Sequence, residues 1–390
     1  MRTLRRVPGG AFGVILLSLL GAALAGSCAG RRPLPGPPVP AAAPDDIAWT
    51  LFLIGDAGAP TPRDPVLLTL IDSAARAPER STIVFLGDNI YPAGLPDSTD
   101  LLWPIAAARL DRQIEVMRRS RVRGFFIPGN HDWAQHGPDG FQAVIRQAEF
   151  IRARSEGLAE LLPPNGCPGP EIRDIGTELR LVFLDTHWWL HDWVKPEHPT
   201  SSCGADRPEE IVAALADAMR GGGERRVIVA GHHPLVSGGK HGGHFGLTDH
   251  LFPLRAVHPA LWLPLPVIGS MYPLLRTSGA SPQDVSNVRN RRMREAIDSG
   301  MAAAPPLAYA AGHEHNLQVL EGVTSRWLLI SGAGYFGHDD LAVWLDRTRF
   351  AAKASGFMRV DLLRSGRTRL GVIGLDRTGA VSELFSTWLE

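Results

Sequence analysis

The sequence predicts an α/β fold in which two mixed β-sheets pack together and helices flank them. The main observation is that five hydrophobic runs, typical of buried strands, are each followed by a polar segment. An open α/β sheet binds its ligands beyond the carboxyl ends of its strands, so we expect these segments to lie near one another. The runs are 51–54, 83–86, 125–127, 227–229 and 307–309, and the polar segments end at residues 56, 91, 132, 232 and 315.

Helical patterns separate the expected strands, as βαβ connections require. Residues 64–77 and 100–119 have the apolar spacing of helices. Asp206 and Pro208 are typical of a helix start, and three glycines at 221–223 end that helix. Residues 286–300 predict a basic, amphipathic surface helix. Near the end of the chain, 357–363 and 369–375 flank a short turn and predict a hairpin in a second sheet.

The polar segments carry the side chains of a metal site. Carboxylate, carboxamide, imidazole and phenol groups together favour hard or borderline cations over thiolate-bound ones. Two cations about 3.5–4 Å apart can clamp a phosphoryl group and acidify a bound water, and they need about seven protein ligands, one of them bridging. The segments supply seven: Asp56, Asp88, Tyr91, Asn130, His232, His313 and His315.

The order of these segments resembles one enzyme family closely. Asp, Gly-Asp-x-x-Tyr, Gly-Asn-His-Asp, Val-x-x-His and Gly-His-x-His occur in that order in calcineurin-like metallophosphoesterases, specifically in the purple acid phosphatase branch. The small tartrate-resistant type is most similar, and the resemblance covers residues 48–390, including His-Glu-His-Asn-Leu-Gln at 313–318. It implies a metallophosphoesterase sandwich of two sheets between helices. It also implies two metal ions, the first held by Asp56, Asp88, Tyr91 and His315, the second by Asn130, His232 and His313, with Asp88 bridging.

Tyr91 discriminates this branch from most other two-metal phosphoesterases. A free phenol has a pKa of about 10, so it binds as phenolate only beside a strongly acidic cation. The resemblance therefore implies Fe(III) at the Tyr91 site and Fe(II), Zn or Mn at the second. The structural alternative is a core tyrosine that precedes a turn at Pro92.

Further residues have roles that only the resemblance implies. His131 would bind phosphate and protonate the leaving oxygen, Asp132 would orient it, and His241 would be a second histidine on the substrate side. Asp132 also suits a helix N-cap, and a loop histidine such as His241 is by default a solvated side chain. Glu314 stands where the family usually has Asp, and His233 could compete with His232 for a metal ion. His244 lies in the same glycine-rich loop as His241, and His187 is expected to form a wall of the pocket.

The N-terminus predicts export. Residues 1–27 combine three early arginines with a short apolar run, the pattern of a signal peptide. The segment ends Leu-Ala-Gly-Ser before Cys28, which resembles a bacterial lipobox and predicts a lipidated Cys28 in a protein anchored to a membrane facing the periplasm or the cell surface. Cleavage after Ala25 and release of a soluble protein is the alternative. Lipidation of Cys28 leaves an even pair, so we expect Cys167 and Cys203 to form a disulfide.

The remaining composition defines the domains. Residues 28–47 are rich in proline and alanine and predict a semi-extended tether, and 48–390 form the catalytic domain. The insertion at about 251–285 is apolar but broken by prolines, so it predicts no regular spanning helix. It either packs on its own core or forms an apolar lip that touches lipid or holds an acyl or aryl leaving group. The chain has 40 basic and 40 acidic residues and no basic run suited to nucleic acid.

The function that follows is hydrolysis of small phosphate monoesters by metal-activated water, with an acidic optimum implied by the resemblance. A phosphodiesterase or nucleotide hydrolase on the same metal centre is the first alternative, because specificity depends on loops that the motifs do not cover. A surface-binding protein without catalysis is the second, although such a protein has no need to keep all seven ligands.

Overall fold

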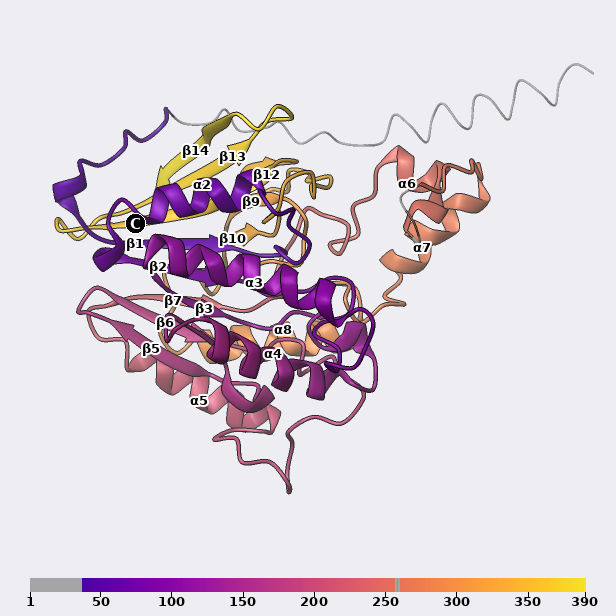
Figure 1. The fold of residues 1–390 in the computed structure, drawn as a ribbon, viewed down its shortest axis with the longest axis horizontal. Helices are drawn as coiled ribbons and strands as arrows, with labels where there is room; N and C mark the ends of the chain where they lie inside the picture. The colour runs from indigo at the N-terminus through magenta and orange to yellow at the C-terminus, as the bar shows by residue number, and fades with distance from the viewer. Residues whose placement is uncertain (1–36, 257, 259) are drawn as a thin grey trace, which may run out of the picture. The chain divides into compact units, whose positions relative to one another are not determined.

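The computed structural model describes residues 37–256, 258 and 260–390. In this part of the chain, fourteen strands form two seven-stranded sheets (Figure 1). The predicted signal peptide, the lipidation site Cys28 and the start of the tether lie outside the described residues. No helix in the described ranges is long and apolar enough to cross a membrane.

The first sheet has the strand order β14-β13-β12-β1-β2-β3-β4. Strands β1 to β4 run parallel, whereas β12, β13 and β14 join the β1 edge in antiparallel pairs. The strands are β1 (Ile47–Ile54), β2 (Ser81–Phe85), β3 (Arg123–Phe126), β4 (Ala159–Leu161), β12 (Ser355–Leu363), β13 (Thr368–Leu375) and β14 (Val381–Trp388).

The second sheet has the order β11-β9-β10-β8-β7-β6-β5. Its four central strands, β10, β8, β7 and β6, are parallel, and antiparallel strands close both edges. The strands are β5 (Glu171–Ile175), β6 (Leu179–Phe183), β7 (Arg226–Ala230), β8 (Ala308–Ala311), β9 (Leu317–Glu321), β10 (Trp327–Ser331) and β11 (Thr348–Ala352).

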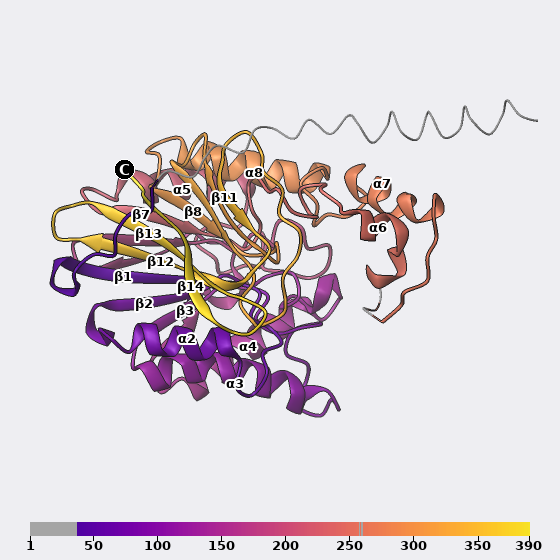
Figure 2. The same cartoon turned by 90° about the horizontal axis from the view of Figure 1, so that it is seen from above.

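Helices cover the outer faces of both sheets (Figures 1 and 2). One face of β1 packs with α2, α3 and α4 through Phe52 and Ile54, and its other face packs between the sheets through Leu51 and Leu53. Burial on both faces explains why the parallel strands read as continuous hydrophobic runs. The second sheet packs against α5 and α8. The predicted sandwich is therefore confirmed. The helices are α2 (Pro65–Ala74), α3 (Trp103–Ser120), α4 (Gly140–Arg154), α5 (Pro208–Arg220) and α8 (Val288–Met301).

Two local predictions were wrong. The C-terminal hairpin does not belong to a second sheet, because β12 pairs with β1, with Leu51 opposite Val360. Asp206 does not cap α5. Pro208 occupies the first turn and favours an extended residue before it, so Arg207 takes the cap position with extended backbone and no side-chain hydrogen bond.

The insertion protrudes from the two-sheet body in both views (Figures 1 and 2). It contains the short helices α6 (Leu247–Leu251) and α7 (Met271–Thr277), with turns of 3-10 helix between them at Pro253–Ala256 and Ile268–Ser270. Its prolines keep the helices short, since proline inside a helix removes a hydrogen bond and clashes with the preceding turn.

The end of the predicted tether is bound to the domain. The guanidinium of Arg369, which is almost fully buried in β13, donates hydrogen bonds of 2.8 Å to the carbonyl oxygens of Val39 and Pro40. Its remaining donors reach Glu383 at 2.6 and 3.0 Å. Residues 39 and 40 are therefore held against the domain. In the loops beyond β4 and β6, a disulfide joins Cys167 to Cys203.

Candidate metal centre

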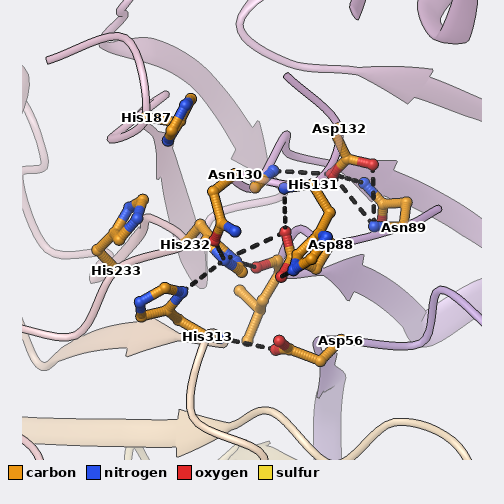
Figure 3. Close-up of polar contacts among 12 residues, drawn as sticks. Asp56, Asp88, Asn89, Asn130, His131, Asp132, His187, His232, His233 and His313 are labelled. Atoms are coloured by element: carbon orange, nitrogen blue, oxygen red, sulfur yellow. Dashed lines mark hydrogen bonds and ion pairs between the residues drawn. The ribbon is translucent and has the colours of Figure 1, made fainter. Parts of the chain in front are cut away.

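All seven predicted ligands lie at the carboxyl ends of strands, where the two sheets face each other. Asp56 follows β1, Asp88 and Tyr91 follow β2, and Asn130 follows β3, all in the first sheet. His232 follows β7, whereas His313 and His315 follow β8, both in the second sheet. Figure 3 shows five of these side chains converging from the two sides: Asp56, Asp88, Asn130, His232 and His313.

The backbone reverses sharply at the points where ligands leave the strands. Asp56, Asp88 and His313 have left-handed φ values of 56°, 53° and 68°. Such conformations are uncommon for residues other than glycine and concentrate at functional sites. Space is equally restricted beside the ligands: a Cβ atom on Gly129 would collide with Asp88 Oδ1, and one on Gly312 would lie 2.5 Å from Asp56 Oδ2.

Three ligands form the first donor group. The Tyr91 hydroxyl donates to Asp56 Oδ1 at 3.0 Å and lies 3.2 Å from His315 Nε2. His315 Nε2 is 3.6 Å from the same Asp56 oxygen. Metal–ligand bonds of about 2.0–2.2 Å place neighbouring ligand atoms about 3 Å apart, so this triangle has the dimensions of a cation site.

The second donor group surrounds His232 Nε2. This nitrogen lies 3.1 Å from Asn130 Oδ1, 3.2 Å from His313 Nδ1 and 3.4 Å from Asp88 Oδ1. Asp56, Asp88 and His232 also offer donor atoms that all lie within 4.8 Å of one another. Asp88 therefore stands between the two groups, where a bridging carboxylate must be.

The ring nitrogens that face away from the site are held by carbonyl oxygens. His232 Nδ1 lies 2.8 Å from the carbonyl oxygen of Leu86, and His313 Nε2 lies 3.1 Å from that of Gln283. A carbonyl only accepts, so these nitrogens carry protons, and His232 Nε2 and His313 Nδ1 face the site, where each can bind a metal ion once it carries no proton. Histidines that bind metal almost always have such a partner on the second nitrogen.

His315 and His233 illustrate the difference between a ligand and its neighbour. Nδ1 of His315 faces the Asp340 carboxylate at 3.8 Å, which leaves Nε2 for the site. Both nitrogens of His233 are used elsewhere, at 2.8 Å from Thr186 Oγ1 and 2.7 Å from Gln283 Oε1. His233 therefore lies close enough to His232 and His313 to share a metal ion with them, but the hydrogen bonds of its two ring nitrogens leave neither nitrogen free to bind one.

The charges of the site depend strongly on one another. Burial raises the pKa of Asp56 to about 7, although His232 lowers it. Burial alone would raise the pKa of Asp88, but His232 and His131 outweigh it and hold it well below the usual range. For His232, the Asp88 carboxylate overcomes burial and raises the pKa to about 9. Burial, followed by the Asp56 and Asp88 charges, raises the pKa of Tyr91.

These residues suit a pair of metal ions. Two buried carboxylates share a dry space with imidazole lone pairs and a phenol, and buried charge is costly unless it is paired. Divalent or trivalent cations would neutralise the carboxylates and displace the phenol proton. The oxygen and nitrogen donors, with no thiolate among them, agree with iron, zinc or manganese.

His131 faces the site, but Asp132 does not orient it. The ring of His131 lies edge-on to Tyr91, 4.5 Å between centroids, and its Nε2 is 3.9 Å from Asp88 Oδ2. Its Nδ1 contacts the Pro92 carbonyl oxygen. Asp132 is fully buried and instead accepts hydrogen bonds from the backbone N–H groups of residues 89, 90 and 129 and from the Asn89 amide (Figure 3). Asp132 therefore links the loop that follows β2 to the loop that follows β3.

His241 reaches the centre, and the structure adds partners that the sequence did not reveal. Its ring lies 3.9 Å from that of His313. Its Nδ1 lies 3.1 Å from Oδ1 of the buried Asp284, which also receives two hydrogen bonds of 2.5 Å from Arg276. Asp284 and Arg276 belong to the insertion, and no motif marks them. His244, on the same loop as His241, is half-buried.

Other missed residues line the Tyr91 side. His338 packs 3.8 Å from the ring of His315 and stacks on Tyr335 at 4.4 Å. His187 is fully buried, and its ring centroid lies 5.9 Å from that of His233. Asp185 turns its carboxylate away, to Trp133 Nε1 at 2.8 Å and to the backbone N–H groups of residues 187 and 188.

A family model for calcineurin-like phosphoesterases matches residues 50–258, just over half of the chain. This range holds the predicted ligands up to His232, and β8 brings His313 and His315 to the site from beyond it. Comparison with curated proteins gave no match.

Several solved structures are similar to this chain. One is GAP50, the anchor in the inner membrane complex of Plasmodium, with 15% identity, a TM-score of 0.50 and 88% of each chain covered. The purple acid phosphatase PPD1 from yellow lupin seeds has 13% identity and a TM-score of 0.50, covering 87% of this chain and 53% of that one. A dimetal phosphatase from Danio rerio has 13% identity and a TM-score of 0.48, covering 88% and 99%.

Proposed function

This chain belongs to the calcineurin-like phosphoesterase family, and we propose that it hydrolyses phosphate monoesters at a two-metal centre, as purple acid phosphatases do. The observation that carries the proposal is the pair of donor groups around Tyr91 and His232, with Asp88 between them. Each imidazole in these groups is held through its other nitrogen, which is the arrangement of metal ligands rather than of core histidines.

The two groups suit different metals. The phenol of Tyr91 favours Fe(III) in the group with Asp56 and His315, since only a strongly acidic cation ionises a phenol at low pH. The group around His232 has neutral imidazole and amide donors and suits Fe(II), Zn or Mn. When bound, the metals would act as Lewis acids on a phosphoryl oxygen and would lower the pKa of water.

His131 is the proposed general acid. Its Nδ1 is occupied by the Pro92 carbonyl oxygen, so Nε2 is the nitrogen that faces the site and can deliver a proton to the leaving oxygen. The backbone N–H of His131 donates to Asp88 Oδ1 at 2.9 Å, which ties the position of the acid to the proposed bridging carboxylate.

His241 is the proposed phosphate-binding residue on the other side of the centre. It packs against His313, and its Nδ1 faces Asp284 and Arg276. Nε2 is therefore left for the substrate, and it can donate to a substrate oxygen when the ring carries a proton on both nitrogens. Together, His131 and His241 would hold an ester between the β3 loop and the loop after β7, with its phosphoryl group over the ligands.

Two other functions are compatible with this fold and are distinguished by the experiment given below. The same donor groups could serve a phosphodiesterase or a nucleotide hydrolase, because the monoester preference depends on the surrounding loops. The fold also occurs in GAP50, a protein described as an anchor, so the fold alone does not establish catalysis. The complete ligand set supports the enzyme.

Export and anchoring remain proposals from the sequence. Residues 1–27 resemble a signal peptide, and Cys28 resembles a lipidation site. Arg369 binds residues 39 and 40. Only residues 29–38 would then connect a lipid at Cys28 with the domain.

The test is hydrolysis of p-nitrophenyl phosphate and of bis-p-nitrophenyl phosphate by the protein loaded with iron plus zinc or manganese, from acid to neutral pH. We expect a clear monoester preference with an acidic optimum. A diester preference would assign the centre to the phosphodiesterase alternative, and lack of hydrolysis of both esters by protein that carries two metals would contradict the enzymatic assignment.

A further inference from the structure

The insertion, which protrudes in Figures 1 and 2, has many exposed apolar side chains. A concentration of exposed apolar surface on a globular protein marks an interaction site. Nine large apolar residues of this segment are exposed: Leu247, Leu261, Trp262, Leu263, Val267, Ile268, Met271, Leu274 and Leu275.

Helix α7 turns its apolar face outward. Met271 and Leu275 lie one turn apart on α7, with Leu274 beside them and Ile268 in the 3-10 turn just before the helix, and all four are exposed. Arg276, in contrast, points inward and pairs with Asp284. Amphipathic helices of globular proteins normally bury the apolar stripe and expose the charges, so α7 has the reverse orientation and presents its apolar stripe to a partner.

The charges around this surface are unbalanced. Residues 250–283 contain no Asp or Glu, and their only Lys or Arg residues are Arg255 and Arg276. The carboxylates that bound the segment are already paired: Asp249 lies 3.2 Å from Lys240, and Asp284 pairs with Arg276. Arg255 lies 3.9 Å over the ring of Trp262 and has no carboxylate partner among the described residues. The apolar surface thus carries one uncompensated positive charge.

We propose that the segment from α6 to α7 docks the protein on an anionic lipid bilayer. Apolar side chains, a tryptophan and an arginine whose stem covers apolar surface are the composition of elements that lie in the membrane interface. The helices are too short to span a membrane, so the segment rests in the headgroup region. The free charge of Arg255 selects anionic headgroups, which a second copy of this surface, bearing the same charge, does not offer.

Docking at this surface would bring the metal centre to its substrate. Arg276 of α7 contacts His241 directly, with Nη2 3.1 Å from Nδ1, and also through Asp284. The same helix would therefore contact the bilayer on one face and support the proposed phosphate-binding histidine on the other. The substrate class is then a phosphate monoester on an amphipathic molecule held in the bilayer. This substrate class rests on the proposed function, whereas the docking itself does not.

The test is flotation of residues 29–390, which omit the predicted signal peptide and lipidation site, with phosphatidylcholine vesicles that contain or lack phosphatidylglycerol. The test variant is Leu274→Ser/Leu275→Ser, and the matched control is Leu101→Ser/Leu102→Ser, an exposed leucine pair on the main body. Loss of two inserted leucines should weaken binding to the anionic vesicles by roughly tenfold or more, while the control binds as the parent does. Arg255→Gln should weaken binding only to vesicles with phosphatidylglycerol.

Circular dichroism and hydrolysis of soluble p-nitrophenyl phosphate show whether each variant is folded and active. Because vesicle binding needs no catalysis, failure of the docking proposal and failure of the proposed function give different results. Equal binding by the parent and by Leu274→Ser/Leu275→Ser would overturn the proposal. A dimer in solution that these substitutions dissociate would also overturn it, by identifying a second copy as the occupant.

Discussion

Asp284 lies 3.1 Å from Nδ1 of His241, although the two residues belong to different parts of the domain. His241 is in the loop after β7, and Asp284 is at the end of the protruding insertion. A loop histidine has many orientations, and a buried carboxylate on one of its nitrogens restricts them. The insertion therefore supplies the residue that positions a proposed substrate-binding side chain.

Asp284→Asn should reduce kcat for p-nitrophenyl phosphate by about 10- to 100-fold, the usual effect of removing a group that orients a working side chain. The metal content should not change, because Asp284 touches none of the seven ligand side chains in the described residues. The measurements are kcat, KM and bound metal for each variant.

Asp249→Asn is the matched control, since Asp249 pairs with Lys240 at the start of the same insertion. It should retain kcat. If Asp284→Asn lowered only the melting temperature and left kcat and KM unchanged, Asp284 would be structural and not a positioning residue.

The ion pair of Asp284 should persist in acid. Burial alone would raise the pKa of Asp284, but the hydrogen bonds from Arg276 and His241 outweigh it and lower the pKa below 3.8. A carboxylate with a depressed folded pKa adds stability above its unfolded pKa and loses it as the pH falls through the folded value. The melting temperature of the parent should therefore exceed that of Asp284→Asn by a constant amount at neutral and mildly acidic pH, and the difference should shrink below about pH 4.

Neighbouring histidines should behave differently when each is removed. His232→Ala should lose metal from one of the two sites and lower kcat by about a thousandfold or more, since metal ions contribute several kcal/mol and each 1.36 kcal/mol is a factor of ten. His233→Ala, one residue away, should retain both metals, because both of its ring nitrogens bond to Thr186 and Gln283. Metal analysis checks this pair. Loss of metal from His233→Ala would place His233 among the ligands.

A Tyr91 phenolate bound to Fe(III) should give the iron-loaded protein a visible charge-transfer band, and Tyr91→Phe should abolish that band. In the metal-free protein, burial and the carboxylates of Asp56 and Asp88 raise the pKa of Tyr91, so the phenol is protonated, and only a strongly acidic cation can ionise it. Tyr335→Phe is the control: Tyr335 lies 6.3 Å from Tyr91 between ring centroids, and its removal should leave the absorption band. A band that survives Tyr91→Phe would exclude a Tyr91 phenolate as its source.

Removal of the disulfide should lower stability without affecting the metal centre. Cys167 and Cys203 are 36 residues apart, and a closed loop of this size contributes roughly 2–4 kcal/mol to the free energy of unfolding. Cys167→Ser/Cys203→Ser should accordingly unfold at lower urea concentration, with unchanged metal content. Rapid labelling of both thiols in the unreduced parent would show that the pair is not formed.

Much of the site could be predicted because its residues follow strands directly. A ligand one to three residues beyond a buried parallel strand must lie at the carboxyl edge of the sheet, so Asp56, Asp88, Asn130 and His232 could be located from local patterns alone. The hydrophobic runs also predicted the sandwich, since strands buried on both faces have few polar residues.

The partners of these residues could not be predicted in the same way. Asp132 follows His131 in the sequence, yet its carboxylate serves the backbone of the neighbouring β2 loop. Which way a side chain turns at a strand end depends on the loops that pack over it, and adjacent residues diverge. The placement of β12 beside β1 likewise depends on pairing across more than 300 residues, which no local pattern encodes.

The sequence by itself determined the fold class and the set of donor atoms, because strand periodicity and strand-end chemistry are local properties of the chain. Only the tertiary structure decided which nitrogen of each histidine faces the site, how Asp284 and Arg276 reach His241, and that α7 turns its apolar face outward. These features depend on contacts between segments far apart in the sequence, and such contacts exist only once both sheets and the insertion have packed.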